Sequence, residues 1–235
     1  MPRDLDWRNL VGDIELLATT GCYERVNKIM SLGLVNSLRR LTARLIAESN
    51  GFYADLGAGP GTSGKIILKE LPSDSILVLV DPSIPMLMLS LDSIPNDRVL
   101  RLGGLFETLP FKDSTIDGIT AMFSYRDAVD YHKALDEIAR VLKADGRLAI
   151  LDFYRHGSSI LHGLIKLYLY AVIPLALLLS RCPGRLEAYK SFLTTLDKML
   201  TREELLEALN ERFRLVRVFD VAPGVAIFYA RGPRK

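Results

Sequence analysis

The stretch Phe52-Tyr53-Ala54-Asp55-Leu56-Gly57-Ala58-Gly59-Pro60-Gly61 decides the fold of this 235-residue chain. Residues 52–56 form a short apolar run, and the glycine-rich turn after it leads into a predicted helix over 62–71. Glycines in such a turn let the backbone approach a ligand closely and open onto the amino end of a helix. The stretch therefore predicts a strand, a ligand-binding turn and a helix.

Strands and helices alternate on the carboxyl side of this turn. Apolar runs predict strands over 76–80, 99–102, 116–123 and 147–153, and helical periodicity predicts helices over 83–91 and 131–142. The Pro223-Gly224 turn predicts a hairpin of strands over 214–221 and 225–231. The expected fold class is α/β: a doubly wound, seven-stranded, mostly parallel sheet with an antiparallel last strand.

Three parts of the chain are expected to differ in character. Residues 1–49 are helical by period from Leu10, with an interruption at Gly33, and residues 50–157 with 187–235 form the α/β domain. Residues 158–186 are a hydrophobic helical insertion, long enough to cross a bilayer. We expect no crossing, because Lys166 costs about 2.5–3.5 kcal/mol inside a membrane and a single span would separate the strands of the sheet. A buried core helix, an oligomer contact and a cap over an apolar ligand remain open.

The composition excludes several classes of protein. The 30 Lys and Arg nearly balance 28 Asp and Glu, which argues against a nucleic-acid partner. The two cysteines and three histidines lack the spacing of a disulfide framework or a metal site, so no metal is expected. The amino terminus, MPRDLDWRN, carries no secretory signal, which predicts a cytoplasmic location. Scarce asparagine and absent glutamine fit a thermophile.

Candidate ligand-binding residues lie at the carboxyl ends of the predicted strands, where α/β sheets bind ligands. The GxGxG spacing differs from the dinucleotide fingerprint. Asp55 would repel a pyrophosphate but attract a ligand that carries an ammonium and a sulfonium. Asp81 suits the two hydroxyls of a ribose. The candidates read from the residues alone are Asp55, Gly57, Ala58, Gly59, Gly61 and Asp81.

Further motifs cover most of the chain. They are YERVNKIMSLG (23–33), ETLPF (107–111) and RVLKADG (140–146), with Arg126 after the fourth strand and Asp152-Phe153 after the fifth. These motifs resemble YDxxNxxMSxG, ExLPF, RVLKPGG, the arginine of FxxR and a Glu-Phe pair. In that order they resemble class I S-adenosylmethionine-dependent methyltransferases, and more closely the ubiquinone/menaquinone-biosynthesis C-methyltransferase family.

The resemblance implies an enzyme of the EC 2.1.1 class that uses S-adenosyl-L-methionine and releases S-adenosyl-L-homocysteine. The implied acceptor is a prenylated quinol of the demethylmenaquinol or ubiquinol type, methylated on a ring carbon in respiratory quinone biosynthesis. Residues 1–49 are then expected to close over the cofactor. The cofactor-binding set gains Tyr23, Pro82, Leu105, Phe106 and Phe123.

Three residues are candidates for catalysis. Arg126 is expected to orient the quinol oxygen and stabilise its anion. His156 is the best conventional base, because its unperturbed pKa lies near 6.5, and Asp152 lies in the same turn.

Departures from the family pattern leave the acceptor open. Leu105 stands where the family has an acid or amide, and Met122 stands where it has a serine. A methyltransferase acting on phospholipid amines or another lipid-soluble small molecule, through N or O, also fits. So does a non-catalytic partner protein that keeps the fold. With a quinol acceptor, residues 167–179 would line an apolar channel and the insertion 158–186 would contact the membrane surface. An oligomer also stays open.

Overall fold

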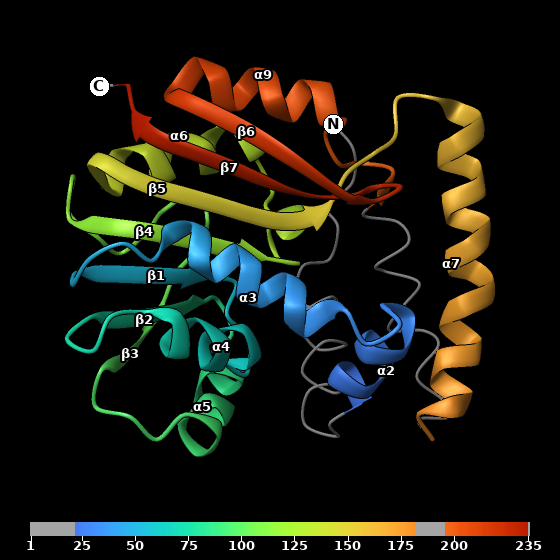
Figure 1. The fold of residues 1–235 in the computed structure, drawn as a ribbon, viewed down its shortest axis with the longest axis horizontal. Helices are drawn as coiled ribbons and strands as arrows, with labels where there is room; N and C mark the ends of the chain where they lie inside the picture. Colours follow the sequence, from blue (N-terminus) through green and yellow to red (C-terminus); the bar gives the residue numbers. More distant parts are fainter. Residues whose placement is uncertain (1–21, 182–195, 235) are drawn as a thin grey trace.

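The computed structural model describes residues 22–181 and 196–234, with side chains from Glu24 onward. Its centre is a seven-stranded sheet in the order β3-β2-β1-β4-β5-β7-β6 (Figure 1). The neighbours from β3 to β5 pair in parallel, whereas β7 is antiparallel to both β5 and β6. The predicted α/β fold is therefore confirmed. The strands are β1 (Phe52–Leu56), β2 (Ile76–Asp81), β3 (Val99–Gly103), β4 (Ile116–Met122), β5 (Leu142–Phe153), β6 (Phe213–Ala222) and β7 (Val225–Pro233).

Helices cover both faces of the sheet, because the central strands are apolar on both sides. In β2, Val78 and Val80 pack into one hydrophobic core, while Leu77 and Leu79 pack into the other. The first core also takes in α6 (Tyr131–Val141) and α9 (Arg202–Arg212). The second takes in α3 (Val35–Ile46), α4 (Thr62–Glu70) and α5 (Ile84–Ser93).

A third, smaller hydrophobic cluster joins α2 (Cys22–Met30) to α7 (Ser159–Leu179). Val26 of α2 lies in it with Leu169 and Ile173 of α7, and Leu196 and Met199 complete it. Both helices lie on the side toward which β1 and β5 point (Figure 1). This layer therefore stands beside the carboxyl ends of the strands, where the ligand site was expected.

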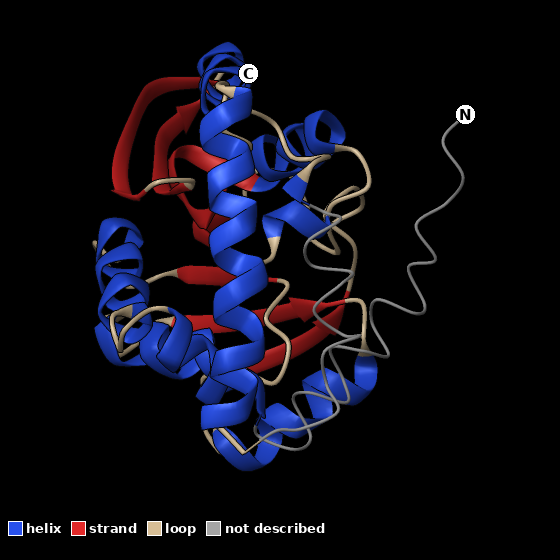
Figure 2. Ribbon diagram, turned by 90° about the vertical axis from the view of Figure 1, so that its right-hand side faces the viewer, coloured by secondary structure: helices blue, strands red, loops and turns tan. Residues whose placement is uncertain are grey.

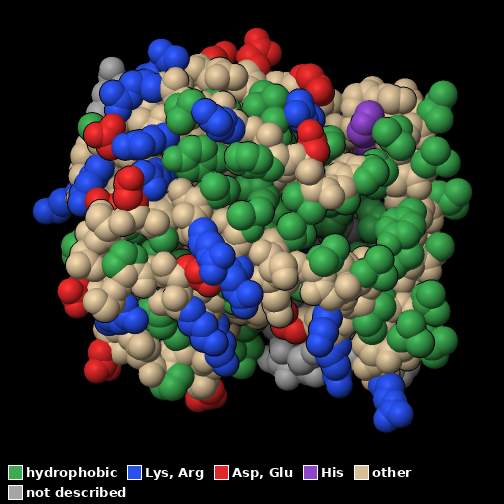
Figure 3. All heavy atoms as spheres, in the orientation of Figure 1, with side chains coloured by type: hydrophobic (Ala, Val, Ile, Leu, Met, Phe, Trp, Pro, Cys, Tyr) green, Lys and Arg blue, Asp and Glu red, His purple; other side chains and the backbone are tan. Residues whose placement is uncertain are grey.

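Most of α7 is exposed along its length. Ile160, Leu167 and Leu178 are 79%, 65% and 72% exposed. The helix α7 lies on the outside of the molecule and faces the viewer in Figure 2, and hydrophobic side chains cover the right-hand side of the surface in Figure 3, where α7 lies in Figure 1. A fully buried core helix is therefore wrong for this segment. Among residues 22–181 and 196–234, α7 is the one helix long and apolar enough to cross a membrane. A single crossing is excluded, because β5 before it and β6 after it belong to one sheet.

Two boundaries of the predicted elements are refined. The amino-terminal helical segment breaks into α2 and α3 around Leu32 and Gly33, which have φ of 51° and 84°; its part over 10–21 lies outside the described residues. The helix predicted over 131–142 ends at Val141, because Leu142 already pairs with Ile116 as the start of β5. Residues 182–186 of the insertion also lie outside the described part, and the division into three parts stays a prediction.

Candidate cofactor and acceptor site

The glycine turn brings the end of β1 against the segment after β4. Gly57 and Gly61 have φ of 65° and 82°, in the left-handed region that favours glycine. A Cβ on Gly57 would lie 2.4 Å from the Cβ of Ser124, and the Ser124 hydroxyl donates to the Leu56 carbonyl at 2.7 Å. Residue 57 therefore has to be glycine for the two loops to meet at the edge of the pocket.

Asp81 ties this turn to the next helix. Its Oδ2 accepts the Gly59 N–H at 2.8 Å, and its Oδ1 accepts the Ser83 N–H at 2.8 Å. Ser83 in turn caps α5 by accepting the Met86 N–H. Asp81 therefore holds the glycine turn and borders the pocket at once.

A buried carboxylate and a buried guanidinium lie at the β1 side of the pocket. Asp55 is 1% exposed; its Oδ1 accepts the Thr120 hydroxyl at 2.7 Å, while its Oδ2 has no hydrogen-bond partner among the described residues. Burial raises the pKa of Asp55 to about 7, against the opposing effects of Thr120 and Arg39. Arg39 of α3 borders the pocket and is 2% exposed. Its two terminal nitrogens donate hydrogen bonds to the Glu24 carboxylate at 3.0 and 3.2 Å.

The Nε of Arg39 also lacks a partner among the described residues. One unsatisfied acceptor and one unsatisfied donor of opposite charge thus lie at the same end of the site. Buried polar atoms without partners are costly. A ligand carrying both an ammonium and a carboxylate group fits this end of the site.

The loop of residues 105–111 forms the opposite wall. Leu105 is 43% exposed, and the Phe106 ring packs edge-on against Tyr125 with centroids 5.9 Å apart. Glu107 accepts the backbone N–H groups of Val129 and Asp130 at 2.7 and 3.1 Å through one oxygen. This wall offers apolar and aromatic surface to a flat ring.

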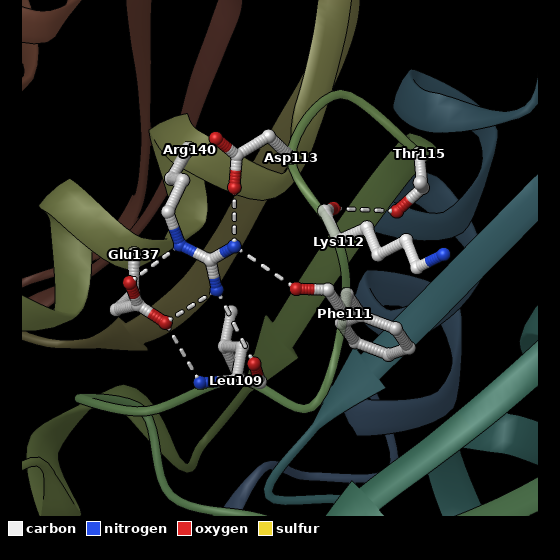
Figure 4. Close-up of polar contacts among 7 residues, drawn as sticks. All are labelled: Leu109, Phe111, Lys112, Asp113, Thr115, Glu137 and Arg140. Atoms are coloured by element: carbon white, nitrogen blue, oxygen red, sulfur yellow. Dashed lines mark hydrogen bonds and ion pairs between the residues drawn. The ribbon is translucent and has the colours of Figure 1, made fainter.

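Arg140 of α6 fixes that loop in place (Figure 4). Its guanidinium donates to Glu137 at 2.6 and 2.7 Å, to the Phe111 carbonyl at 2.9 Å and to Asp113 at 2.7 Å. Glu137 also accepts the Leu109 N–H at 2.9 Å. The ETLPF and RVLKADG motifs are therefore parts of one structural clamp, which we call the Arg140 clamp.

A second arginine network lies inside the pocket, after β4. Arg126, in the short 3-10 helix η1 (Tyr125–Asp127), is 9% exposed and borders the pocket. Its Nη1 and its backbone N–H donate to the two oxygens of buried Asp152 at 3.2 and 3.0 Å, and its Nε lies 3.7 Å from Asp127. Asp152 therefore positions Arg126, and Asp127 shares the pocket with it.

Phe123, two residues before this helix, has an unusual backbone conformation. Phe123 has φ of 60°, rare for a residue with a side chain, and its N–H donates to the Leu151 carbonyl at 2.7 Å. Strain of this kind is concentrated at functional sites. Phe123 borders the pocket and its ring lies 5.9 Å from that of Phe153.

The pocket brings together many of the predicted site residues. Those that line it are Gly57, Ala58, Gly59, Asp81, Pro82, Leu105, Phe106, Phe123 and Arg126. Asp55, Gly61 and Asp152 are buried next to lining residues, whereas His156 lies in the loop after β5, where its Nδ1 accepts the Ser158 N–H at 3.1 Å. The side chain of Tyr23 lies outside the described residues.

Among the lining residues that the sequence interpretation did not assign to the site are the charged residues Arg39 and Asp127. A signal existed for Arg39, because its spacing from Val35 and Ile46 puts it on the buried face of α3. Asp127 could have been noticed only as a carboxylate beside the predicted arginine.

Comparisons with known proteins agree with this geometry. Residues 15–227 match the ubiE/COQ5 methyltransferase family. A demethylmenaquinone methyltransferase of Lactiplantibacillus plantarum is 35% identical over 159 residues, 65% of this chain and 67% of that protein. The ubiquinone/menaquinone biosynthesis C-methyltransferase UbiE of Geotalea uraniireducens is 27% identical over 213 residues, 88% of this chain and 89% of that protein.

Solved structures agree on the fold. A SAM-dependent methyltransferase of Thermotoga maritima superimposes with a TM-score of 0.59 at 20% identity, covering 96% of this chain and all of that one. One from Aquifex aeolicus has a TM-score of 0.57 at 16% identity, covering 89% of this chain and 97% of that one. The chain therefore belongs to the ubiE/COQ5 methyltransferase family and is a class I S-adenosylmethionine-dependent methyltransferase.

Proposed function

We propose that the protein methylates a ring carbon of a prenylated quinol, of the demethylmenaquinol or ubiquinol type. The observation that carries this proposal is a pocket with Arg39 at one end, buried Asp55 close behind it and an aromatic wall at Phe106, in a chain whose relatives are named for that reaction. The charged end suits the amino-acid part of the cofactor, and the names of the relatives favour a quinol as the acceptor.

The residues present fit S-adenosylmethionine. Bound there, it supplies an electrophilic methyl group on sulfur, and S-adenosylhomocysteine is the product. We assign the ribose hydroxyls to Asp81, the ammonium to the side of Asp55, and the carboxylate to Arg39. Leu105 and Phe106 would enclose the adenine, with apolar contact replacing the polar contact of the family pattern. Residues 1–49, Tyr23 included, would close over the bound cofactor.

For the acceptor, we assign Arg126 to the quinol oxygen. Its guanidinium is fixed by Asp152 before any ligand arrives, so little reorganisation is needed when negative charge develops on that oxygen. Phe123, which also borders the pocket, would hold the ring in line with the methyl group.

We further propose that the cytoplasmic enzyme docks at the membrane surface through α7. A prenylated quinol dissolves in lipid, and the outward residues Ile160, Leu167 and Leu178 form an apolar surface beside the pocket side of the sheet. Vesicles of anionic lipid should co-sediment with the protein at low salt. Leu167→Glu with Leu178→Glu should abolish this, and no vesicle binding by the wild type would contradict the docking.

The decisive experiment combines binding with product analysis. Calorimetry with S-adenosylmethionine and S-adenosylhomocysteine should show micromolar binding that is lost in Asp81→Ala and kept in Asp97→Ala, a matched change at an exposed loop acid. Incubation with a reduced demethylmenaquinone should then give a product one methyl group heavier, with the methyl on carbon. A methyl group found instead on the nitrogen of a lipid amine or the oxygen of a phenol would show that the acceptor belongs to another chemical class. Failure to bind either nucleoside would favour the non-catalytic partner.

A further inference from the structure

Three carboxylates border the pocket, and the structure leaves one of them without hydrogen bonds. Asp81 and Glu107 each accept two backbone N–H groups. The Asp127 carboxylate accepts none from residues 22–181 and 196–234; its contact is the ion pair with Arg126 Nε at 3.7 Å. Its side chain is 24% exposed and lies in the pocket wall. Asp127 is therefore placed to meet a ligand rather than to hold a loop.

The surroundings of Asp127 make it a better base than an ordinary carboxylate. Burial raises its pKa to about 6; Arg126 opposes this rise, while the charges of Asp152 and Asp81 add to it. Tyr131 of α6 also faces this cluster, and burial raises its pKa well above the usual value, so it stays neutral. A base near 6 is ionised at neutral pH and still binds a proton far more strongly than one near 4.

We infer that Asp127 is the proton acceptor of the reaction, receiving the hydroxyl proton of the acceptor bound beside Arg126. This inference rests on the proposed function. The quinol O–H bond breaks, its proton goes to Asp127, and its electron pair enters the ring. The neighbouring ring carbon bonds to the methyl group as the methyl–sulfur bond breaks, its pair remaining on sulfur. The ring carbon then loses its hydrogen as a proton, the oxygen regains one from Asp127, and one proton is released overall.

His156 is not needed for this step. It does not line the pocket, and its Nδ1 already accepts the Ser158 N–H. Asp127 and Arg126 instead lie in one turn of η1, so the acceptor of the proton and the cation that stabilises the resulting oxyanion come together.

The test compares Asp127→Asn with Asp97→Asn, a matched change at an exposed loop acid before β3. Asp127→Asn should lower turnover roughly 10²–10⁴-fold, while S-adenosylmethionine affinity stays within about threefold of wild type. The acid limb of the wild-type rate profile near pH 6 should disappear, and Asp127→Glu should restore part of the rate. Asp97→Asn should match wild type in all three measurements.

A second readout does not depend on turnover. In protein labelled with ¹³C at aspartate carboxyl carbons, one resonance should titrate near pH 6 and be absent from Asp127→Asn. Wild-type turnover in Asp127→Asn, or no such resonance, overturns the inference and leaves the proposed function standing. If the wild type binds S-adenosylmethionine but methylates no quinol, the proposed function fails and the inference fails with it.

Discussion

The Arg140 clamp and the Arg126 network use the same chemistry in two settings. Arg140 pairs with two carboxylates while 32% exposed, and its hydrogen bonds lower the pKa of Glu137. Arg126 also pairs with two carboxylates but is 9% exposed, and there burial raises the pKa values of Asp127 and Asp152. An arginine partner alone therefore does not decide whether a carboxyl is a strong or weak acid.

Loss of water makes the difference between the two networks. Near the surface, water still solvates the carboxylates, so the ion pair keeps them charged and the network holds a loop. In the pocket, burial penalises each charge and raises the pKa of both carboxyl groups in spite of the nearby arginine. The first arrangement suits a scaffold and the second suits a site for proton transfer.

Removing Arg126 should have the largest effect. Arg126→Ala leaves buried Asp152 without its cation, so the free energy of unfolding should fall by about 3–5 kcal/mol. Turnover should fall at least roughly 10²-fold because the oxyanion loses its partner. Arg126→Lys keeps the charge, so it should be more stable than Arg126→Ala, while its turnover should remain low. Urea unfolding and single-turnover rates measure both; a stable, fully active Arg126→Ala would contradict the assignment.

Asp55 should make the stability of the ligand-free protein depend on pH. Its raised pKa means that the native state binds this proton more tightly than the unfolded chain does. Its contribution to stability is complete below about pH 4 and is lost as pH rises through about 7. Asp55→Asn should therefore gain stability relative to wild type across that range, by up to about 4 kcal/mol.

Urea unfolding at steps across this range checks the prediction for Asp55. The matched variant Asp97→Asn, at an exposed acid, should show a difference from wild type that does not change with pH. A flat difference for Asp55→Asn as well would show that its carboxyl titrates normally.

Weakening the Arg140 clamp should have a moderate, structural effect. Arg140→Gln removes charged hydrogen bonds to Glu137 and Asp113, so stability should fall by about 1–3 kcal/mol. Cofactor affinity should fall several-fold because the loop of residues 105–111 loosens, whereas the pH profile of turnover should not move. The control is Arg44→Gln, an exposed pair with Glu70 expected to cost under about 1 kcal/mol. Equal losses in both variants would show that the clamp adds nothing.

The smallest effect should come from His156. With Asp127 as the base, His156→Ala should keep turnover within roughly threefold, because the imidazole contacts Ser158 rather than the pocket. Initial rates at several pH values measure this. A large loss with unchanged cofactor affinity would restore His156 as the base.

The elements and the glycine turn could be read from the sequence because local pattern decides them. The run Leu77-Val78-Leu79-Val80 has to be a strand buried on both faces, and the turn at Gly57 follows from the positive φ that only glycine adopts freely. The end of α6 could not be read, because pairing of Leu142 with Ile116 overrides the helical pattern.

The partners of the buried charges could not be read from the sequence. Arg39 pairs with Glu24 of another helix, and the pKa of Asp127 is raised by its burial and by the charges of Asp152 in β5 and Asp81 at the end of β2. Neither relation leaves a local pattern in the sequence. Exposure of α7 also follows from its position beside the sheet rather than from its composition.

The cluster between α2 and α7 has a consequence for how the chain folds. Val26 and Leu169 lie at opposite sides of the β1–β5 region in the sequence, so their contact closes a very long loop. Such contacts form late, whereas the neighbouring strands β1 and β2 pair over short separations. A growing or refolding chain should thus build the glycine turn between β1 and α4 first. The layer of α2 and α7 should assemble last, so the part of the chain beside the carboxyl ends of the strands is the last to mature.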